Sequence, residues 1–199
     1  MPRADRLLLI LGLATGPAVA ADDPPGARGL FVAATGGFLS GAADDDDGRD
    51  AGTWIGAGGG LRVGEEIVDG LTLGLHFAGG WGNANSGDYA LGFGGMLVEA
   101  GYRPLARWPG VILTVGTGLG GGRLSGAGDG APDGAAVGAM HALGLTYELP
   151  LHDARSGDEV GLSVAPTFRW VVVPGIDDTS AAFHLFALGV EVVWYAGRW

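Results

Sequence analysis

The sequence of 199 residues contains no cysteine and no lysine. Without pairs of cysteines, the chain is not a small secreted module held together by disulfides. After the N-terminal segment, no stretch is apolar for the roughly 18 residues that a membrane-crossing helix needs. The basic residues are 11 arginines against 22 acidic residues, and this net charge of -11 disfavours binding to nucleic-acid phosphates.

The start of the chain has the pattern of a secretory signal. Arg3 and Arg6 precede an apolar core, and Ala18-Val19-Ala20 forms a small-x-small cleavage motif. The apolar core is too short to span a bilayer, which argues against an uncleaved membrane anchor. We therefore predict a cleaved signal peptide over 1–20, a polar periplasmic segment over 21–28 and a single domain over 29–199.

The mean hydropathy of +0.29 is high for an exported chain that has no apolar run. Strands account for it, because they place apolar side chains at every second position. Near the C-terminus, for example, Phe186, Leu188 and Val190 alternate with Ala187 and Gly189. Helix is the competing assignment, but the chain has 41 glycines and each costs a helix about 1 kcal/mol relative to alanine.

Segments of this kind recur along the chain and end at charges, glycine or proline, which predicts eight antiparallel strands. The strands are expected over 29–40, 53–63, 71–81, 89–103, 111–124, 136–149, 160–173 and 183–195. Polar connections at 41–52, 82–88, 125–135 and 174–182 alternate with shorter or proline-containing ones at 64–70, 104–110 and 150–159. With both termini in the periplasm, the polar set would lie outside the cell.

The two faces of these strands favour lipid over water as the surroundings. One face is large and apolar, whereas the other is mostly glycine, alanine, threonine and serine. A soluble barrel, such as a lipocalin-like or avidin-like binder, needs polar side chains along its outer face. We expect two aromatic girdles where the apolar face meets the headgroups. Their members are Phe38, Trp54, Trp81, Tyr89 and Trp170 at the outer end and Phe31, Tyr102, Trp108, Tyr147 and Trp194 at the inner end.

The signal, the eight alternating segments and the aromatic C-terminus together resemble the small eight-stranded outer-membrane barrels of Gram-negative bacteria, similar to the OmpA transmembrane domain and the OmpX/Ail-like proteins. The resemblance covers the whole mature chain. It implies an all-β fold, an eight-stranded antiparallel up-and-down transmembrane β-barrel, placed in the outer membrane by the barrel-assembly machinery acting on the C-terminal strand. The last strand departs from the family pattern at Gly197: either a bulge near Ala196-Gly197 switches the face, or the strand ends at Tyr195.

Charges inside the strands are few, and we expect them to form an ionic plug in the lumen. An eight-stranded interior is just wide enough for side chains to fill it, and unpaired charges are costly away from water. The strand order brings four of the charges together near the periplasmic end and places Arg169 higher. The network comprises Arg62, Glu99, Glu148, Arg169 and Glu191. The alternative is a gated conduit in which Arg62 exchanges carboxylate partners, with luminal glycines such as Gly58 and Gly118 leaving room for water.

Two positions conflict with regular alternation. Placing Glu99 inward also turns Leu91 and Phe93 inward, unless a bulge forms at Gly94-Gly95. Pro166 lies inside a strand of a barrel that has no edge, so we expect a bulge there as well.

Five aspartates gather in the first outer connection: Asp44, Asp45, Asp46, Asp47 and Asp50. A calcium loop is excluded, because aligning Gly48 with the obligatory glycine puts Ala43 and Trp54 at the first and last ligand positions. A solvated charge run is the expected reading. Loose binding of divalent cations that bridge to lipopolysaccharide phosphates stays open.

No motif predicts catalysis, a cofactor or a metal. The Gly-x-Gly-x-x-Gly string at 116–121 is not followed by a helix, so the phosphate-binding geometry of that fingerprint is missing. The four histidines lack the serine two residues later that outer-membrane lipid A deacylases carry, and neither a Gly-x-Ser-x-Gly elbow nor spaced zinc ligands occur. These histidines are His76, His141, His152 and His184.

The sequence therefore predicts a non-enzymatic outer-membrane barrel protein with a structural or surface-interaction role, acting through its acidic loops. A narrow porin-like channel and a lipid-modifying enzyme are the two alternatives. The expected partners are outer-membrane lipid and lipopolysaccharide, and the chain is expected to be a monomer. The outer connections are too short and too low in complexity to identify a ligand or receptor.

Overall fold

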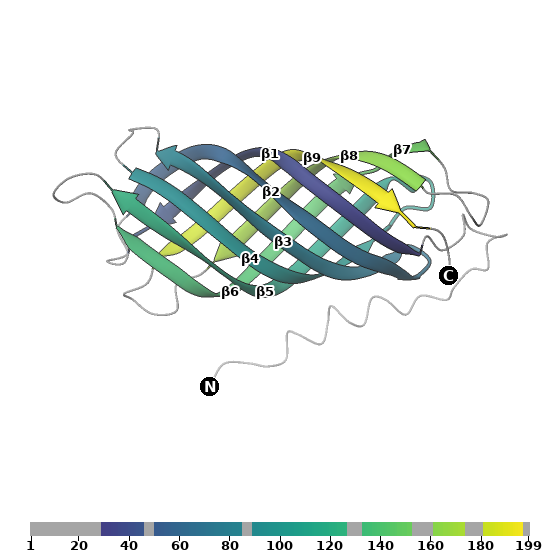
Figure 1. Ribbon diagram of the computed structural model, residues 1–199, viewed down its shortest axis with the longest axis horizontal. Coiled ribbons are helices and arrows are strands. Elements are labelled where there is room, and N and C mark those ends of the chain that lie inside the picture. Colours follow the sequence, from purple (N-terminus) through teal and green to yellow (C-terminus); the bar gives the residue numbers. More distant parts are fainter. Residues whose placement is uncertain are drawn as a thin grey trace.

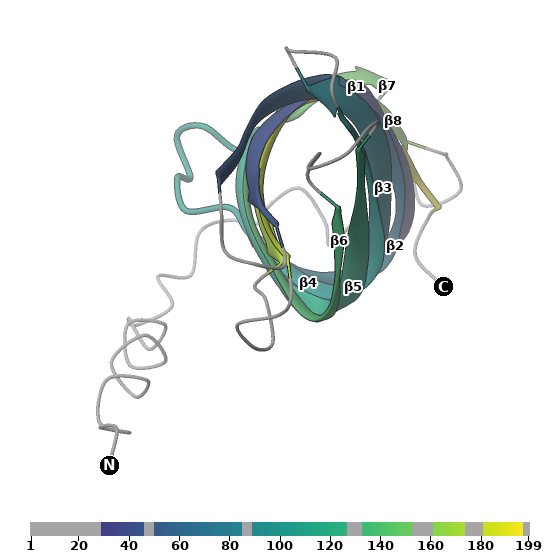
Figure 2. The same cartoon turned by 90° about the vertical axis from the view of Figure 1, so that its left-hand side faces the viewer.

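The strands close into a barrel, seen from the side in Figure 1 and along its axis in Figure 2. This computed structural model describes residues 29–45, 50–84, 89–126, 133–152, 161–173 and 181–196, so the predicted signal peptide and the segment after it lie outside the described residues. The strands are β1 (Leu30–Asp44), β2 (Asp50–Val68), β3 (Leu71–Ala84), β4 (Tyr89–Tyr102), β5 (Val111–Gly126), β6 (Gly134–Tyr147), β7 (Leu149–His152), β8 (Gly161–Val173) and β9 (Ala182–Tyr195). Their order is β6-β5-β4-β3-β2-β1-β9-β8-β7, and a further pairing of β6 with β8 closes the sheet.

The nine segments make eight barrel strands, because β6 and β7 are two parts of one strand. Only Glu148 separates them, and both pair antiparallel with β8; the register of β6 continues through Leu149 and Pro150 and shifts between Pro150 and His152. The predicted eight-stranded antiparallel barrel is confirmed.

The prediction of a bulge at Pro166 is wrong, since β8 pairs with β9 there without a register shift. The interruption lies instead in the opposite neighbour, where β6 gives way to β7 beside Pro166, whose backbone has no N–H for the ladder.

The register shows how the barrel is staggered. One row of directly paired residues leaves β1 at Val32, passes once through every barrel strand and returns to β1 at Ala42, ten residues further on (32 to 42). A stagger of this size requires the strands to tilt against the barrel axis. Figure 1 shows this tilt directly. Residues at equal distances from their strand ends therefore lie at different heights.

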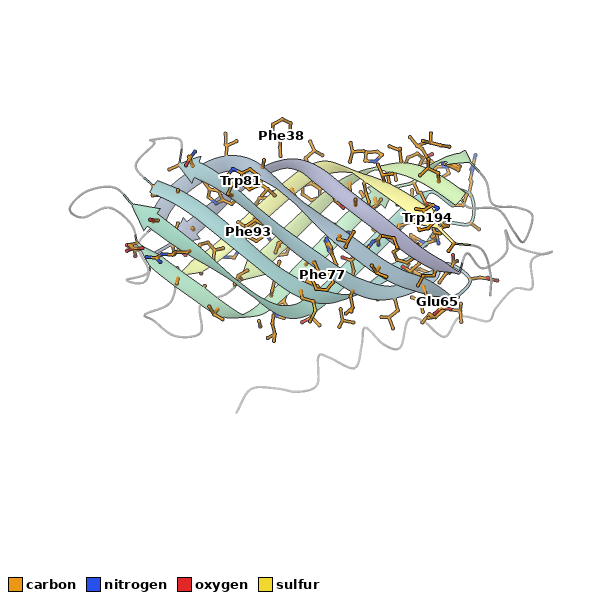
Figure 3. The ribbon with its side chains drawn as sticks, viewed as in Figure 1. Phe38, Glu65, Phe77, Trp81, Phe93 and Trp194 are labelled. Atoms are coloured by element: carbon orange, nitrogen blue, oxygen red, sulfur yellow. The ribbon has the colours of Figure 1, made fainter. Side chains whose placement is uncertain are left out.

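The outer face of the wall is an apolar belt, which agrees with the predicted orientation of the strands. Phe38 is 75% exposed, Leu119 70% and Val137 72%, and all lie within strands. Figure 3 shows the Phe38 ring projecting away from the wall. Among the described residues, no helix is long and apolar enough to cross a membrane.

Three of the ten residues assigned to aromatic girdles point into the barrel instead. Trp54, Tyr89 and Phe31 are buried, because each shares the parity of inward-facing residues on its strand. The other seven are exposed, including Trp81 and Trp194 at opposite ends of the wall. The girdles thus contain fewer aromatic residues than the sequence predicts, and the three buried rings pack in the interior of the barrel.

The strand ends define two ends of the barrel. Phe31 and Tyr195 pair at one end, which we call the terminus end, and the opposite end is called the loop end. At the terminus end β2 runs on to Val68, into the predicted connection, and turns at Gly70 with a φ of 77° that suits glycine. The last strand ends at Tyr195, the second of the two predicted alternatives, and Gly197 and Trp199 lie outside the described residues.

Candidate functional site

An ion cluster lies in the lumen, in the half of the barrel nearer the terminus end. Arg62 Nη1 lies 3.1 Å from Glu99 Oε1, and Arg62 Nη2 lies 2.5 Å from Glu191 Oε1. Arg169 Nη1 donates to Glu99 Oε2, and Arg169 Nη2 lies 3.6 Å from Glu191 Oε2. All four side chains are buried, and they come from β2, β4, β8 and β9. Two guanidinium groups thus face two carboxylates, so their formal charges cancel inside the wall.

Two further side chains hold the two carboxylates in place. His76 Nδ1 lies 3.3 Å from Glu99 Oε2 and 3.0 Å from Arg169 Nη1. The Thr35 hydroxyl donates to Glu191 Oε2 at 3.0 Å. Buried carboxylates need several such partners to offset their lost hydration. His76 and Thr35 are therefore parts of the cluster, although the sequence did not assign them to it.

A second ion cluster lies at the terminus end and is separate from the first. Arg103 Nη2 lies 2.9 Å from Glu148 Oε2, and Arg103 Nη1 lies 3.3 Å from Glu66 Oε2. The Tyr195 hydroxyl donates to Glu148 Oε1 at 2.5 Å. Burial lowers the pKa of the Arg103 guanidinium, but Tyr195, Glu148 and Glu66 outweigh burial and hold this pKa above its ordinary value. Arg103 consequently remains charged at the mouth of the barrel.

The ring of Phe31 lies between the two clusters. Its centroid is 4.9 Å from Cζ of Arg62 and 6.1 Å from the ring centroid of Tyr195. The cation-π contact faces the first cluster, and the tilted ring pair faces the second. An apolar layer thus divides the ionic part of the lumen in two.

The structure corrects the predicted network in two respects. Arg169 was expected above the other charges, yet it binds both carboxylates of the first cluster. Glu148 was expected among them, yet it binds Arg103 and Tyr195 in the second cluster. The cause is the stagger of the strands, which a comparison of strand ends does not reveal.

A small cavity of about 50 Å³ adjoins the first cluster. Its lining includes the polar side chains of His76, Arg169 and Thr35 and the apolar side chains of Leu39 and Leu97. His76 Nε2 and Arg169 Nε are buried and have no hydrogen-bond partner within the described part of the chain. A cavity of this size with polar groups in its wall is large enough to hold water.

The half of the lumen nearer the loop end is filled by apolar side chains. Leu91, Leu124, Phe183, Leu185 and Trp54 are almost completely buried and belong to one contiguous cluster. An inward Glu99 required either a bulge at Gly94-Gly95 or an inward Leu91. The second alternative is the one observed, because β4 keeps a regular register at Gly94-Gly95 and Leu91 is buried in the lumen. The assignment of large apolar residues to the lipid face alone is wrong in this half.

The acidic segment is only partly described. Asp45 is 4% exposed, so it does not belong to a solvated charge run as the sequence predicted. It shares the inward parity of Ala43, which directs its side chain to the mouth of the lumen. Asp44 is half-buried, and Asp46, Asp47 and the side chain of Asp50 lie outside the described residues.

Two histidines face outward from the wall. His141 and His184 are exposed, and His141 Nδ1 lies 3.1 Å from the Thr117 hydroxyl on the neighbouring strand. This contact gives the polar His141 side chain a partner within the apolar belt. In the described ranges no three His, Cys, Asp or Glu side chains come together as a metal site would require.

Five residues of the two clusters were missed by the sequence reasoning: Thr35, His76, Glu66, Arg103 and Tyr195. The inward parity of His76, shared with Thr72 and Gly74, was a usable signal. Arg103 and Glu66 follow or end strands, where alternation no longer tells which way a side chain points. Their convergence is visible only from the pairing of β3 with β2 and β4.

Comparison with solved structures supports the fold. The chain is similar to Ail, the attachment invasion locus protein of Yersinia pestis, at 14% identity and a TM-score of 0.51, over 83% of this chain and 99% of that chain. Ail in complex with the heparin analogue sucrose octasulfate matches at 16% identity and a TM-score of 0.50, over 83% and 99%. No protein-family model and no curated protein matches the sequence. At these identities the likeness shows a shared eight-stranded membrane-barrel fold and leaves the function open.

Proposed function

We propose that the chain is an outer-membrane barrel protein with a closed lumen, whose contacts with partners are made at the loop end. The apolar belt supports a membrane as its surroundings, because a wall facing water would need polar side chains. The observation that carries the proposal is the filling of the lumen. The ion cluster around Glu99 and Glu191 blocks one half, and the apolar cluster around Leu91 and Phe183 blocks the other.

Planar-bilayer recording tests the closed lumen. The refolded chain without residues 1–20 should insert and give no stepwise conductance, while a general porin in the same bilayer serves as the positive control. Steady conductance from the unmodified protein would show that the lumen is open and would favour a conduit instead.

The conduit is kept as a second candidate because of the cavity beside His76. A cavity large enough to hold water lies next to Arg169 Nε and His76 Nε2, and an ion path would start there if the first cluster rearranged. Under this alternative, Arg62→Ala would raise conductance. Under the closed-lumen proposal, Arg62→Ala lowers the stability of the barrel and produces no conductance across the bilayer.

Cell fractionation and protease accessibility test the location and orientation. We expect the protein in the outer-membrane fraction, with cleavage by added protease confined to connections at the loop end. Cleavage at the turn around Gly70 in intact cells would reverse the orientation. Because no catalytic role is proposed, overproduction should leave lipid A unchanged, and a change abolished by His141→Ala or His184→Ala would favour the enzyme alternative.

A further inference from the structure

The turn between β4 and β5, residues 103–110, projects sideways from the barrel wall at the terminus end. Figure 2 shows it in teal, outside the ring of strands. We call it the lateral turn. Leu105 is 45% exposed and Trp108 is 60% exposed, and Arg107 between them is exposed as well. Two large apolar side chains and one cation thus stand on a segment that belongs to no strand.

Hydrogen bonds hold the lateral turn in one conformation. The Trp108 N–H donates to the Leu105 carbonyl at 3.0 Å, and the Val111 N–H donates to the Trp108 carbonyl at 3.0 Å. At its two bases, the Arg103 N–H donates to the Gly70 carbonyl and the Glu148 N–H donates to the Gly110 carbonyl. The ion pairs of Arg103 with Glu148 and Glu66 fasten the first base to the second ion cluster. The sideways direction is therefore built into the fold.

The lateral turn leaves the wall at the edge of the apolar belt. It follows directly on Tyr102, whose ring is exposed, and leads into Val111, which pairs with the exposed Tyr147. Exposed tyrosines at a strand end mark the depth where hydrocarbon meets headgroups. A segment that leaves the wall sideways at this depth runs along the membrane surface and not into bulk water.

We propose that the lateral turn is a phospholipid-binding element, with Leu105 and Trp108 inserted at the headgroup boundary and the Arg107 guanidinium bound to a lipid phosphate. The proposal rests on the membrane location proposed above. Guanidinium groups bind phosphate oxygens bidentately, and the indole ring suits a boundary that is apolar on one side and wet on the other. Arg103 is engaged by two carboxylates, which leaves Arg107 as the cation of this turn that faces outward.

The absence of cysteine allows a direct test with single labels. Ala106→Cys carries an environment-sensitive fluorophore in the lateral turn, Asp69→Cys carries it in the exposed turn between β2 and β3, and Leu188→Cys reports insertion of the belt. The full chain is refolded into phosphatidylcholine vesicles with or without phosphatidylglycerol. We expect the label at 106 to be quenched by headgroup-proximal lipid nitroxides and shielded from iodide, and the label at 69 to behave in the opposite way.

Two variants separate the contributions. Replacing Leu105 and Trp108 together by serine should abolish the lipid quenching at 106, while the label at Leu188→Cys stays quenched. With the native Arg107, we expect phosphatidylglycerol in the vesicles to increase the lipid quenching of the label at 106. Arg107→Gln should keep the quenching seen in phosphatidylcholine alone and lose this increase. The inference is overturned if the label at 106 is as accessible to iodide as the label at 69 while the belt label is quenched, since the turn would then face water or a protein partner. Loss of quenching at the belt label as well would overturn the membrane location itself.

Discussion

The two halves of the lumen are filled by opposite means within one continuous wall. Towards the terminus end, Arg62, Arg169, Glu99 and Glu191 neutralise one another. Towards the loop end, leucine and aromatic side chains such as Leu185 pack as in the core of a water-soluble protein. The rule that polar residues face inward and apolar residues face outward therefore holds in the half of the lumen where charges pair, and it fails in the other half. In the other half, buried apolar side chains pack against one another, and any apolar side chain of suitable volume can take part in such a core.

The two kinds of filling also respond differently to substitution. An ion cluster is stable only when complete, because removing one partner leaves a buried charge unpaired. An apolar core loses contacts in proportion to the volume removed and tolerates swaps of similar size. Predictions about the two halves therefore differ in magnitude and in the substitutions that restore stability.

The largest loss is expected from Arg62→Ala. It removes the guanidinium that binds Glu99 and Glu191, and breaking a buried pair costs about 3–5 kcal/mol. Urea unfolding in lipid vesicles and the heat-modifiable melting temperature measure the loss. Arg123→Ala is the matched control and should change little, because the Arg123 side chain is exposed on β5 and lies outside both ion clusters. An unchanged melting temperature for Arg62→Ala would show that the ion cluster contributes nothing.

A smaller loss is expected from Leu185→Ala in the apolar half. Leu185 is fully buried, and a leucine-to-alanine change in a core costs roughly 2–5 kcal/mol depending on how far the site collapses. Leu188→Ala on the same strand is the control, because Leu188 faces outward and lipid can fill the space it leaves. Equal losses at both positions would contradict the assignment of the two faces. Leu185→Met should retain most of the stability. Arg62→Lys should not, because one ammonium group does not reproduce the contacts that the two guanidinium nitrogens make with Glu99 and Glu191.

Tyr195→Phe should lower the unfolding free energy by about 1–2 kcal/mol. It removes one hydrogen bond to the Glu148 carboxylate and keeps the ring that packs against Phe31. Tyr102→Phe provides the control, since the Tyr102 ring faces outward. If both variants unfold at the same urea concentration as the parent, the second ion cluster is not coupled to the folding of the barrel.

The smallest effect, and the only gain, is expected from His141→Leu. The substitution replaces a polar group in the apolar belt and gives up one exposed hydrogen bond to Thr117, so stability should rise by about 1 kcal/mol or less. The same unfolding assay measures it. A clear loss would mean that His141 and Thr117 contribute more together than a leucine in lipid.

Much of the fold could be predicted because alternation is a local property. The alternation of Leu73, Leu75 and Phe77 with smaller residues predicts both a strand and the face of it that points outward. The prediction of side-chain direction and of strand irregularities failed where one sequence pattern is compatible with two structures. Trp54 and Tyr89 satisfy the aromatic pattern of a girdle equally well from inside, and Pro166 disturbs the neighbouring strand and not its own.

The candidate site was predicted only as a set of inward charges. Arg62, Glu99, Glu191 and Arg169 do meet, but the assignment of Glu148 to the same group is wrong. Their roles as a plug remain a prediction that the conductance and stability measurements address. The lateral turn could not be predicted from alternation, because its orientation depends on two hydrogen bonds to neighbouring elements. The Gly70 carbonyl accepts one from the Arg103 N–H, and the Glu148 N–H donates the other to the Gly110 carbonyl.

That this chain makes strands with one apolar face follows from its amino-acid sequence, because side-chain direction alternates with every residue whatever the strand pairs with. Which charges lie at the same height in the lumen is set by the closed barrel and not by any one segment. That depends on the ten-residue stagger from Val32 to Ala42 around the closed barrel, a property of all the pairings together and of no single strand.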